Sequence, residues 1–252
     1  MHDERFTRTR HILGPDGLER LTRAHVAVIG LGAVGSYAVE ALTRSGIGRL
    51  TLVDFDEVSL SNINRQLYAL ESTVGKPKAD LARNRVRDIN PSCRVDSHRC
   101  FVDAETAEHL LDDRPDLVID AIDSLNPKVD LLAAVRTRQI PLVSSMGAAL
   151  RRRPGLVRVS ALEDTHSCPL ARQVRKRLRR REVPLDFPCV WSAEEPDRDA
   201  LLDLEESEKH LVDRGRKRRS LGSLPTITGI FGLTAANTAL QILLDEDWSA
   251  DN

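Results

Sequence analysis

A group of polar side chains follows the second apolar run of the sequence and has the chemistry to hold ribose and phosphate. The run ends at Asp54, and Asp56 comes two residues later. The polar group itself is Ser61, Asn62, Asn64 and Arg65. Asparagine amides bind ribose or phosphate oxygens, and the planar guanidinium of arginine fits phosphate through two hydrogen bonds. A helix cap followed by a surface arginine is the alternative interpretation.

Lys78 stands where a helix is expected to begin, which is an unfavourable place for a cation. Gly75, Lys76 and Pro77 lead into an apolar-periodic stretch that predicts a helix over residues 79–89, and proline suits a first helical turn. The helix dipole disfavours a positive charge at this end. Lys78 therefore indicates an anionic partner such as phosphate, and a solvated surface lysine is the alternative.

A third acidic side chain is expected at the same edge of the fold. The apolar run 117–123 predicts a buried strand that ends in Asp123, with Ser124 next in the chain. Ligands of open parallel sheets bind beyond the carboxyl ends of the strands, where Asp54 is also expected. A carboxylate at this place holds Mg²⁺ beside phosphates. The alternative is an ordinary N-cap for a helix over residues 128–138.

The element that must position these side chains is a strand, glycine turn, helix and strand over residues 25–56. Gly30 permits a tight turn, Gly32 lets phosphate approach the backbone, and Gly35 lets the helix pack close to the first strand. The helix N-terminus attracts phosphate. Asp54 then lies where it accepts a hydrogen bond from a ribose hydroxyl. The pattern does not choose among NAD, FAD and ATP, and a turn that binds nothing is the alternative.

Strands and helices alternate from residue 26 to residue 145, which predicts an α/β fold with a Rossmann-like, doubly wound, mainly parallel sheet. We expect one domain over 1–252 with a nucleotide-binding core at 24–150. Residues 151–252 are expected to complete the sheet and to form the substrate-binding and dimerisation half. The 252 residues suffice for a sizeable core, and 41% hydrophobic with 30% charged residues is typical of a soluble globular protein.

Cysteine usage and the first residues bear on metal content and location. The four cysteines, at 93, 100, 168 and 189, include no C-x-x-C pair, so we expect no zinc site. Their number suits a reducing compartment. Residues 1–11 are charged and contain no apolar signal-peptide core, so a cytoplasmic location is expected.

A strongly basic segment begins after residue 150. Residues 151–181 contain eleven Lys and Arg and two acids, which is a net charge of +9 in a chain of net charge −1. Leu170, Val174 and Leu178 recur every four residues and predict a helix with one apolar stripe and a basic remainder. A polyanion such as RNA is one interpretation, and a solvated face is the other. The candidate contacts are Arg172, Arg175, Lys176, Arg179 and Arg180.

The last third of the chain contains a long polar stretch and an uncharged one. Residues 193–220 lack an apolar pattern, which predicts a functional crossover or a mobile loop. Residues 221–244 carry no charge and are long enough to span a bilayer. Their threonines, Asn237 and Gln241 instead favour a helix buried against the sheet or at a dimer interface, so no membrane span is expected.

Taken together, the motifs resemble the adenylating superfamily of ubiquitin-activating enzymes and their bacterial sulfur-carrier-activating relatives. The resemblance covers nearly the whole chain. It rests on RFTR at 5–8, GLGAVGS at 30–36, LVDFDEVSLSNINRQ at 52–66, GKPKA at 75–79 and DAIDS at 120–124. It implies that ATP is the nucleotide and that a carboxylate is adenylated.

The resemblance also implies roles for individual residues. Asp54 would hold the ATP ribose, and the ATP phosphates would be contacted by Asn62, Arg65 and Lys78. Asp123 would bind or orient Mg²⁺. Arg8 matches an arginine that reaches the phosphates from a partner subunit, which implies a homodimer. A cysteine in this superfamily can accept an acyl or sulfur group, so Cys189 is either such a thiol or a structural cysteine.

The second half resembles a branch of the superfamily that modifies tRNA. The matching segments are SSMGAA at 144–149, THSCPLARQVRKRLRR at 165–180, CVWSAEEP at 189–196 and GSLPTITGIFGLTAANTAL at 222–240. This branch implies ATP-dependent activation of a threonylcarbamoyl carboxylate on a tRNA adenosine, followed by ring closure with net loss of water. A cysteine-desulfurase-type partner is compatible with the resemblance.

One position departs from the branch, and two other functions remain as alternatives. Arg151, Arg152 and Arg153 stand where the resemblance leads us to expect a less basic turn, which argues against a monovalent-cation site there. Adenylation of the C-terminus of a ubiquitin-like sulfur carrier is the first alternative, although the C-x-x-C pairs usual in that branch are missing. A nucleotide-binding scaffold without catalysis is the second.

Overall fold

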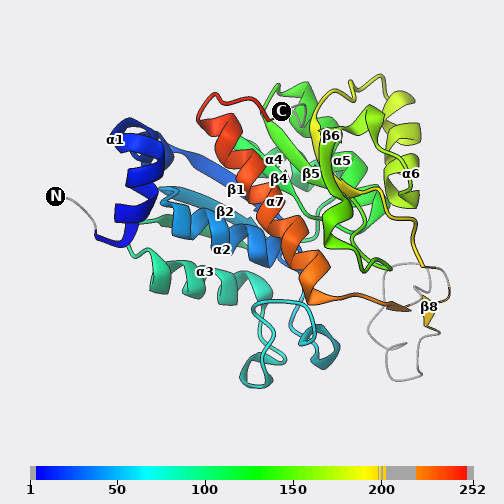
Figure 1. The fold of residues 1–252 in the computed structure, drawn as a ribbon, viewed down its shortest axis with the longest axis horizontal. Coiled ribbons are helices and arrows are strands. Elements are labelled where there is room, and N and C mark those ends of the chain that lie inside the picture. The colour runs from blue at the N-terminus through cyan, green and yellow to red at the C-terminus, as the bar shows by residue number, and fades with distance from the viewer. Residues whose placement is uncertain (1–3, 198, 200, 203–219, 249–252) are drawn as a thin grey trace.

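One mainly parallel sheet runs through the whole molecule. The computed structural model describes residues 4–197, 199, 201–202 and 220–248, and its seven-stranded sheet has the order β3-β2-β1-β4-β5-β7-β6 (Figure 1). The strands are β1 (His25–Ile29), β2 (Arg49–Val53), β3 (Arg94–His98), β4 (Leu117–Asp120), β5 (Leu142–Ser145), β6 (Val157–Ala161) and β7 (Pro188–Ser192). Each neighbouring pair is parallel except β6 with β7. The predicted doubly wound α/β sheet, completed by the second half of the chain, is confirmed.

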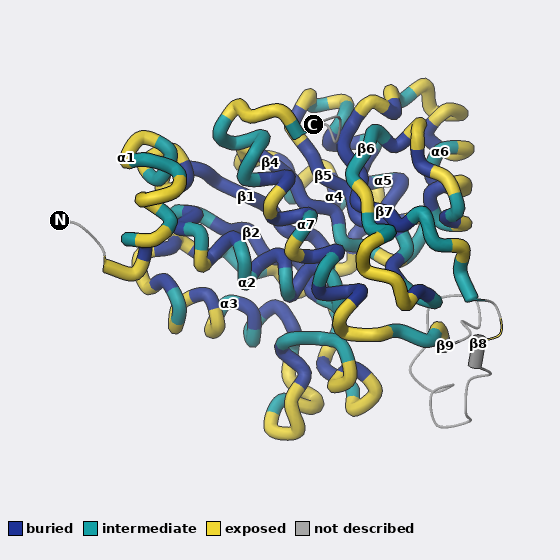
Figure 2. The backbone as a smooth tube through the Cα atoms, viewed as in Figure 1, coloured by how far each residue is buried: buried dark blue, intermediate teal, exposed yellow. Residues whose placement is uncertain are grey.

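Helices cover both faces of this sheet. On one face lie α2 (Gly35–Ser45), α3 (Lys78–Ile89) and α7 (Pro225–Leu243), which share a core with the alternate residues Val26 and Val28 of β1. The other face carries α4 (Ala104–Leu110), α5 (Leu125–Thr137) and α6 (Pro169–Arg179), which pack on Ala27 and Ile29. Burial on both faces explains the nearly continuous apolar strands. Figure 2 shows the sheet and the inner sides of the helices as the buried layer.

The N-terminal helix is interrupted by a kink. Helix α1 (Thr7–Arg23) follows a short 3-10 turn, Glu4–Phe6, and its kink lies at Gly14, where φ is 74° and ψ is 171°. Pro15 is compatible with the helical turn that follows the kink, because a residue at a first helical position needs no N–H donor. The second part of the helix then leads directly into β1.

Two element boundaries and one strand differ from the sequence expectation. Strand β4 ends at Asp120, so Asp123 lies three residues beyond it, and α5 begins at Leu125 with Ser124 as its N-cap residue. Helix α4 ends at Leu110, and the next residue, Leu111, is buried. Strand β6 was not predicted. Its pattern Val-Arg-Val-Ser-Ala alternates as an antiparallel edge strand does, and the neighbouring arginines obscure that alternation.

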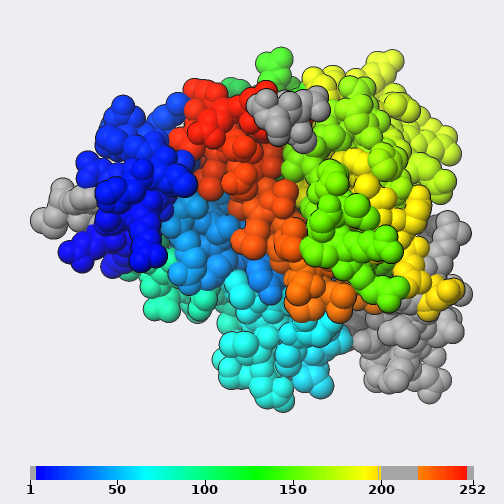
Figure 3. All heavy atoms as spheres, viewed as in Figure 1, coloured from blue at the N-terminus to red at the C-terminus, as the bar shows by residue number. Residues whose placement is uncertain are grey.

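The uncharged C-terminal stretch forms the expected helix against the sheet. Helix α7 packs on α2 and on β5 and β7 (Figure 1). By length and composition alone it is apolar enough to cross a membrane, and half of its most apolar window is buried inside the protein. Figure 3 shows its outer side as a band between α1 and the β6 region. Most of the predicted crossover, residues 203–219, lies outside the described residues; strands β8 (Leu201–Leu202) and β9 (Ser220–Leu221) pair at its two ends.

A fully buried ion pair lies under the carboxyl end of β4. The Lys128 ammonium and the Asp120 carboxylate have exposed fractions of zero and approach within 2.5 Å. Lys128 also donates to the carbonyl oxygen of Ser145 at 2.9 Å, and Asp120 accepts from the Ser144 hydroxyl and the Ile122 N–H. These hydrogen bonds satisfy both charges, and they join β4, β5 and α5 at the edge where ligands are expected.

Removal of one member of this pair tests its importance. We expect Lys128→Met to lower the free energy of unfolding by about 3–5 kcal/mol, because Asp120 would be left buried without a partner. Arg181→Ala is the matched control. It removes a half-exposed arginine that pairs with Asp130, a residue of the same helix as Lys128, and it should lower the free energy of unfolding by less than about 1 kcal/mol. Urea unfolding measures both. Equal stability of the two variants would contradict the prediction.

Candidate functional site

The glycine turn between β1 and α2 has the close approaches that its sequence predicts. Gly30 adopts a φ of +92°, and a Cβ atom there would lie 2.8 Å from the carbonyl oxygen of Ala121. A Cβ atom on Gly35 would lie 1.8 Å from the carbonyl oxygen of Gly30, so only glycine lets the helix start so near the strand. At Gly32 the nearest atom, Gln66 Nε2, would be 3.7 Å away. That distance is an ordinary van der Waals contact, and the lack of a side chain at Gly32 lets a phosphate approach the backbone.

Asp54 joins the glycine turn to the end of β2. Its carboxylate accepts hydrogen bonds from the N–H of Leu31 at 2.7 Å and from the N–H of Asp56 at 2.8 Å. Burial raises the pKa of this carboxyl, while the Lys78 ammonium and the two N–H donors act in the opposite direction. Each carboxylate oxygen keeps a lone pair for a further donor. The geometry therefore suits a ribose hydroxyl, as the sequence predicts.

Lys78 begins α3 and is directed toward the same edge. It is 4% exposed, and its ammonium forms an ion pair with Asp56 at 2.9 Å. The backbone places it there, because Lys78 N–H donates to the Asp56 carbonyl and Val58 N–H donates to that of Lys76. A nearly buried ammonium beside the ribose-type carboxylate is well placed to meet phosphate, with Asp56 as its partner in the absence of a ligand.

The polar segment after β2 forms a compact turn whose side chains organise one another. Asn62 is buried and accepts the N–H of Ser59, so it is a cap, and the hydroxyls of Ser59 and Ser61 lie 3.0 Å apart. Arg65 donates to the Ser61 carbonyl and to the Asn64 amide, both at 2.8 Å. Asn64 in turn donates to the carbonyl of Ser223, just before α7. The capping and ligand interpretations of this segment are therefore compatible.

Asp123 and Ser124 lie in the loop between β4 and α5. Asp123 is exposed and accepts a hydrogen bond from the Ser124 hydroxyl at 3.2 Å. The acid that ends the strand is Asp120, which the Lys128 pair occupies. The expectation that Asp123 ends a strand is therefore wrong, but its place at the ligand edge holds, because Gly30 packs against Ala121 in the same loop.

Arg8 is the one predicted phosphate contact that the fold does not bring to this edge. It is exposed on the first turn of α1, two residues after Phe6. Phe6 packs against Gly46, which follows the C-terminus of α2, whereas the glycine turn precedes the N-terminus of α2. An 11-residue helix is about 16 Å long. The first turn of α1, which contains Arg8, and the glycine turn of one chain therefore lie at opposite ends of α2; Figure 1 shows α1 beside one end of α2.

The basic helix α6 separates into an outward and an inward set of cations. Arg172, Lys176, Arg179 and Arg180 are exposed, as a polyanion-binding face requires. Arg175 differs from them: it is partly buried, and its guanidinium donates to the carbonyl oxygen of Thr165 at 2.7 Å. Burial lowers the pKa of Arg175. Arg175 is thus a structural link to the preceding loop rather than part of the exposed face.

Cys189 does not have the surroundings of a reactive thiol. It is the second residue of β7, all of which is buried, and its exposed fraction is zero. Burial raises the pKa of its thiol well above the ordinary value, although the Lys128 ammonium opposes that effect. A reactive cysteine needs a lowered pKa and access to its substrate. The structural interpretation of Cys189 is therefore the better one.

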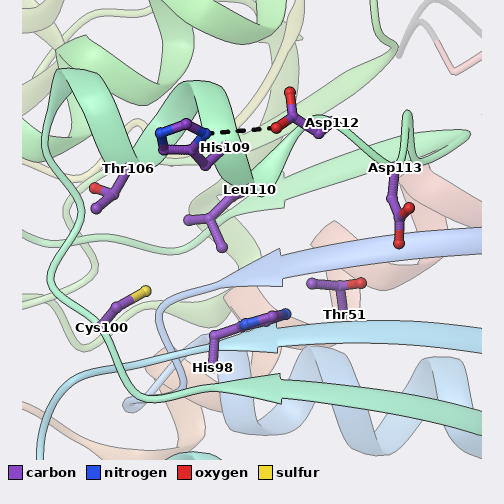
Figure 4. Close-up of a pocket in the computed structure, with 8 residues that line it drawn as sticks. All are labelled: Thr51, His98, Cys100, Thr106, His109, Leu110, Asp112 and Asp113. Carbon is purple, nitrogen blue, oxygen red and sulfur yellow. Dashed lines mark ion pairs between the residues drawn. The ribbon is translucent and has the colours of Figure 1, made fainter.

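Two further features near the strand ends carry no strong sequence signal. Phe55 and Phe101 follow β2 and β3, are both about half-exposed, and stack edge to face with ring centroids 5.1 Å apart. They lie beside Asp54, where an exposed apolar surface suits a planar base. A cavity of about 380 Å³ lies between β2, β3 and α4 (Figure 4). Its polar lining includes His98, Cys100 and His109, and none of the predicted nucleotide contacts lines it.

The fold and this edge define a nucleotide-binding α/β protein, and comparison with known proteins identifies the family. The model of the ThiF family matches residues 6–251, so the chain belongs to this family. It is 45% identical over 191 residues to the tRNA threonylcarbamoyladenosine dehydratase of Bacillus subtilis. The matched region covers 76% of this chain and 75% of that protein. The enzyme of the same name from Escherichia coli is 36% identical over 96% of this chain and 94% of its own length.

A solved structure agrees with the sequence relatives. The crystal structure of the E. coli tRNA N6-threonylcarbamoyladenosine dehydratase in complex with ATP superposes with a TM-score of 0.85 and 34% identity. The match covers 96% of this chain and 94% of that one. The likeness therefore includes the second half, where β6, β7 and α6 lie, as well as the glycine turn.

The glycine turn offers a paired test. Gly35→Ala should destabilise the fold by about 1–3 kcal/mol or more and weaken ATP binding, because its Cβ would collide with the Gly30 carbonyl. Gly32→Ala should leave the unfolding free energy within about 0.5 kcal/mol and weaken ATP binding alone. Urea unfolding and calorimetric titration with ATP separate the two effects. Unchanged ATP affinity in Gly32→Ala would show that the phosphates take another path.

Proposed function

We propose that this protein catalyses the ATP-dependent dehydration of threonylcarbamoyladenosine in tRNA, through adenylation of the threonylcarbamoyl carboxylate. The observation that carries the proposal is the set of side chains at the strand ends, in a chain that matches dehydratases of that name along nearly its whole length. A ribose-type carboxylate, a tight glycine turn with no side chain at Gly32 and two cations lie within one edge of the sheet.

The residues at this edge have the parts that adenylation needs. The attack of a carboxylate on the α-phosphate of ATP joins two anions, so the site must neutralise phosphate charge and hold attacker and leaving group in line. We assign the ribose to Asp54 and the adenine to the surface of Phe55 and Phe101. Lys78 and Arg65 supply positive charge to the phosphates, and Asn62 supplies a polar contact. Asp56, Ser61, Asn64 and Ser124 complete the surroundings as polar neighbours of these groups.

Mg²⁺ fits the same site through Asp123. Magnesium is commonly held by one or two carboxylates together with substrate phosphates, so a dedicated cluster of protein ligands is not required. Asp123 is an exposed carboxylate held by the Ser124 hydroxyl in the loop that packs on Gly30. When bound, the ion would offset phosphate charge and assist the departure of pyrophosphate.

The second half of the reaction requires no nucleophile from the protein. The carboxylate forms an acyl adenylate and releases pyrophosphate. A nucleophilic atom of the same threonylcarbamoyl group then attacks the acyl carbon, releases AMP, loses its proton and closes the ring. The tRNA thereby loses one water in total. Cys189, buried in β7, has no part in this sequence. If a cysteine-desulfurase-type protein binds, Cys189 is for the same reason not its sulfur acceptor.

The substrate carboxylate arrives on tRNA, and the outward face of α6 suits this polyanion. We propose that Arg172, Lys176, Arg179 and Arg180 contact tRNA phosphates, with Arg175 outside this set. Contacts of this kind position a nucleic acid without reading its sequence. We propose a cytoplasmic location, because both tRNA and ATP are available there.

A homodimer explains the location of Arg8. The fold separates Arg8 from the glycine turn of its own chain by the length of α2. We propose that Arg8 reaches the phosphates of a second copy, across a two-fold interface that includes the outer side of α7, where Leu233 is half-exposed. Each active site would then be built from two chains.

The first prediction of this proposal concerns the product. The protein, incubated with ATP, Mg²⁺ and tRNA that carries threonylcarbamoyladenosine, should convert that nucleoside to a species lighter by one water and form one AMP per conversion. Arg65→Ala and Asp123→Ala should each lower turnover about 10²- to 10³-fold, because the first removes a cation from the phosphates and the second removes a carboxylate that would hold Mg²⁺ beside them. Mass spectrometry of gently digested nucleosides, together with an AMP assay, measures both.

A folded Arg65→Ala or Asp123→Ala variant with normal turnover would contradict the site assignment. An unchanged nucleoside, with ATP–pyrophosphate exchange in the presence of a ubiquitin-like carrier, would contradict the choice of substrate while leaving adenylation in place. Arg181→Ala serves as a control for the removal of a surface arginine, because Arg181 pairs with Asp130 on the α5 side.

The second prediction concerns the dimer. Arg8→Ala and Asp123→Ala chains should each be nearly inactive alone. If Arg8 acts across the interface, an equal mixture that has exchanged subunits should recover about one quarter of wild-type turnover per chain, because half of the dimers contain one intact site of two. A mixture that stays as inactive as its components would show that Arg8 acts within its own chain or not at all.

A further inference from the structure

Arg151 is a buried cation that faces backbone carbonyl oxygens. Its exposed fraction is 4%. The guanidinium donates to the carbonyls of Gly147 and Ala149, to that of Ser167 at 3.0 Å and to that of Glu194 at 3.3 Å. Buried arginines usually pair with a carboxylate, but these four acceptors are all main-chain oxygens. Arg151 thus differs from the exposed Arg152 beside it, which pairs with Asp197.

The four carbonyls belong to three segments of the chain, and this guanidinium donates to all three. Residues 147–149 follow β5, Ser167 precedes α6, and Glu194 follows β7. Two residues at the cluster adopt left-handed backbone conformations without being glycine: Leu150 has a φ of 63° and Ser167 a φ of 50°. Such conformations persist only where the surroundings enforce them. The segments are therefore held in an unfavourable shape that directs their carbonyls inward.

Converging main-chain carbonyls are the surroundings that proteins offer to bound metal cations such as Ca²⁺ and K⁺. Here a guanidinium, whose five N–H groups spread in one plane, donates to the carbonyls instead. The resemblance led us to expect a less basic turn here, and the three arginines argued against a monovalent-cation site. The residues present do not fit such an ion, because the Arg151 side chain already occupies the centre of the carbonyls.

We propose that Arg151 is the permanent cation of this loop cluster and that its positive charge makes a bound alkali ion unnecessary there. It ties the loop after β5 to the start of α6 and to the segment after β7. The loop after β5 neighbours β4, which leads to Asp123, and α6 carries the exposed basic face. Arg151 is thereby a positioning residue that sets the tRNA surface relative to the adenylation edge. Only this last step rests on the proposed function.

The first test uses stability and needs no substrate. Wild-type protein and Arg152→Ala should show the same thermal midpoint in potassium chloride and in tetramethylammonium chloride of equal ionic strength. Arg151→Ala should have a lower midpoint, because its carbonyls lose their donor, and millimolar guanidinium or potassium ions should raise it again. A wild-type midpoint that falls when potassium is removed would overturn the proposal. An Arg151→Ala variant with the same midpoint as Arg152→Ala, unchanged by guanidinium or potassium ions, would overturn it as well.

The second test separates positioning from general loss of structure. Arg151→Ala should raise KM for tRNA by about tenfold with a smaller change in kcat, and millimolar guanidinium should reverse the increase. Arg179→Ala should raise KM without a change in thermal midpoint. If Arg151→Ala does not fold, Arg151→Lys replaces it. A single ammonium cannot donate to all three segments, so this variant should have a thermal midpoint below that of wild type and a KM for tRNA above it.

A fall in kcat alone, with KM unchanged, would contradict the positioning role. The two proposals fail in distinguishable ways. If the wild-type enzyme does not dehydrate the tRNA nucleoside, the proposed function is wrong, while the thermal measurements still decide whether Arg151 replaces a bound ion.

Discussion

The buried ion pair between Lys128 and Asp120 is the constraint on which the rest of the ligand edge depends. Two charges without solvent contact are costly unless each is matched and hydrogen-bonded, and here the Ser144 hydroxyl, the Ser145 carbonyl and the Ile122 N–H complete the set. The pair fixes where β4 stops, how β5 lies beside it and where α5 starts. The loop that contains Asp123 grows directly from this junction and packs on Gly30. A buried ion pair inside an otherwise apolar sheet therefore holds the strand ends at which the nucleotide-binding residues lie.

Sequence reasoning located the nucleotide half well, because its signals are local. Gly30, Gly35 and Asp54 do their work within one strand–helix–strand unit, and the close contacts predicted at Gly30 and Gly35 are present. Lys78 was predicted from its conflict with the helix dipole; the structure buries it in an ion pair with Asp56, and its contact with phosphate stays a prediction. Asp120 and Lys128 were missed as a pair, since an acid at the end of an apolar run and a lysine eight residues later look like a strand end and a helix start. Only the tertiary fold shows that they meet.

The basic segment shows a different limit of sequence reasoning. Composition counts charges, but it does not show which way a side chain points. Arg151 and Arg175 donate to main-chain carbonyls inside the protein, whereas Arg172 and Arg179 stand on the surface. Strand β6 was missed for a related reason, because the arginines before and within it obscure a short alternating pattern. Some arginines of the basic segment therefore stabilise the interior through hydrogen bonds, while others form the exposed basic face.

The packing of α7 on α2 also determines the order in which this chain can fold. The two helices lie side by side in space but are separated by most of the sequence. During synthesis, α2 can pack on β1 and α3, but the part of its surface that α7 covers stays exposed until α7 has left the ribosome. Contacts between such distant segments slow folding, because a long loop must close first. The nucleotide pocket, although encoded near the start of the chain, is among the last parts of the molecule to become complete.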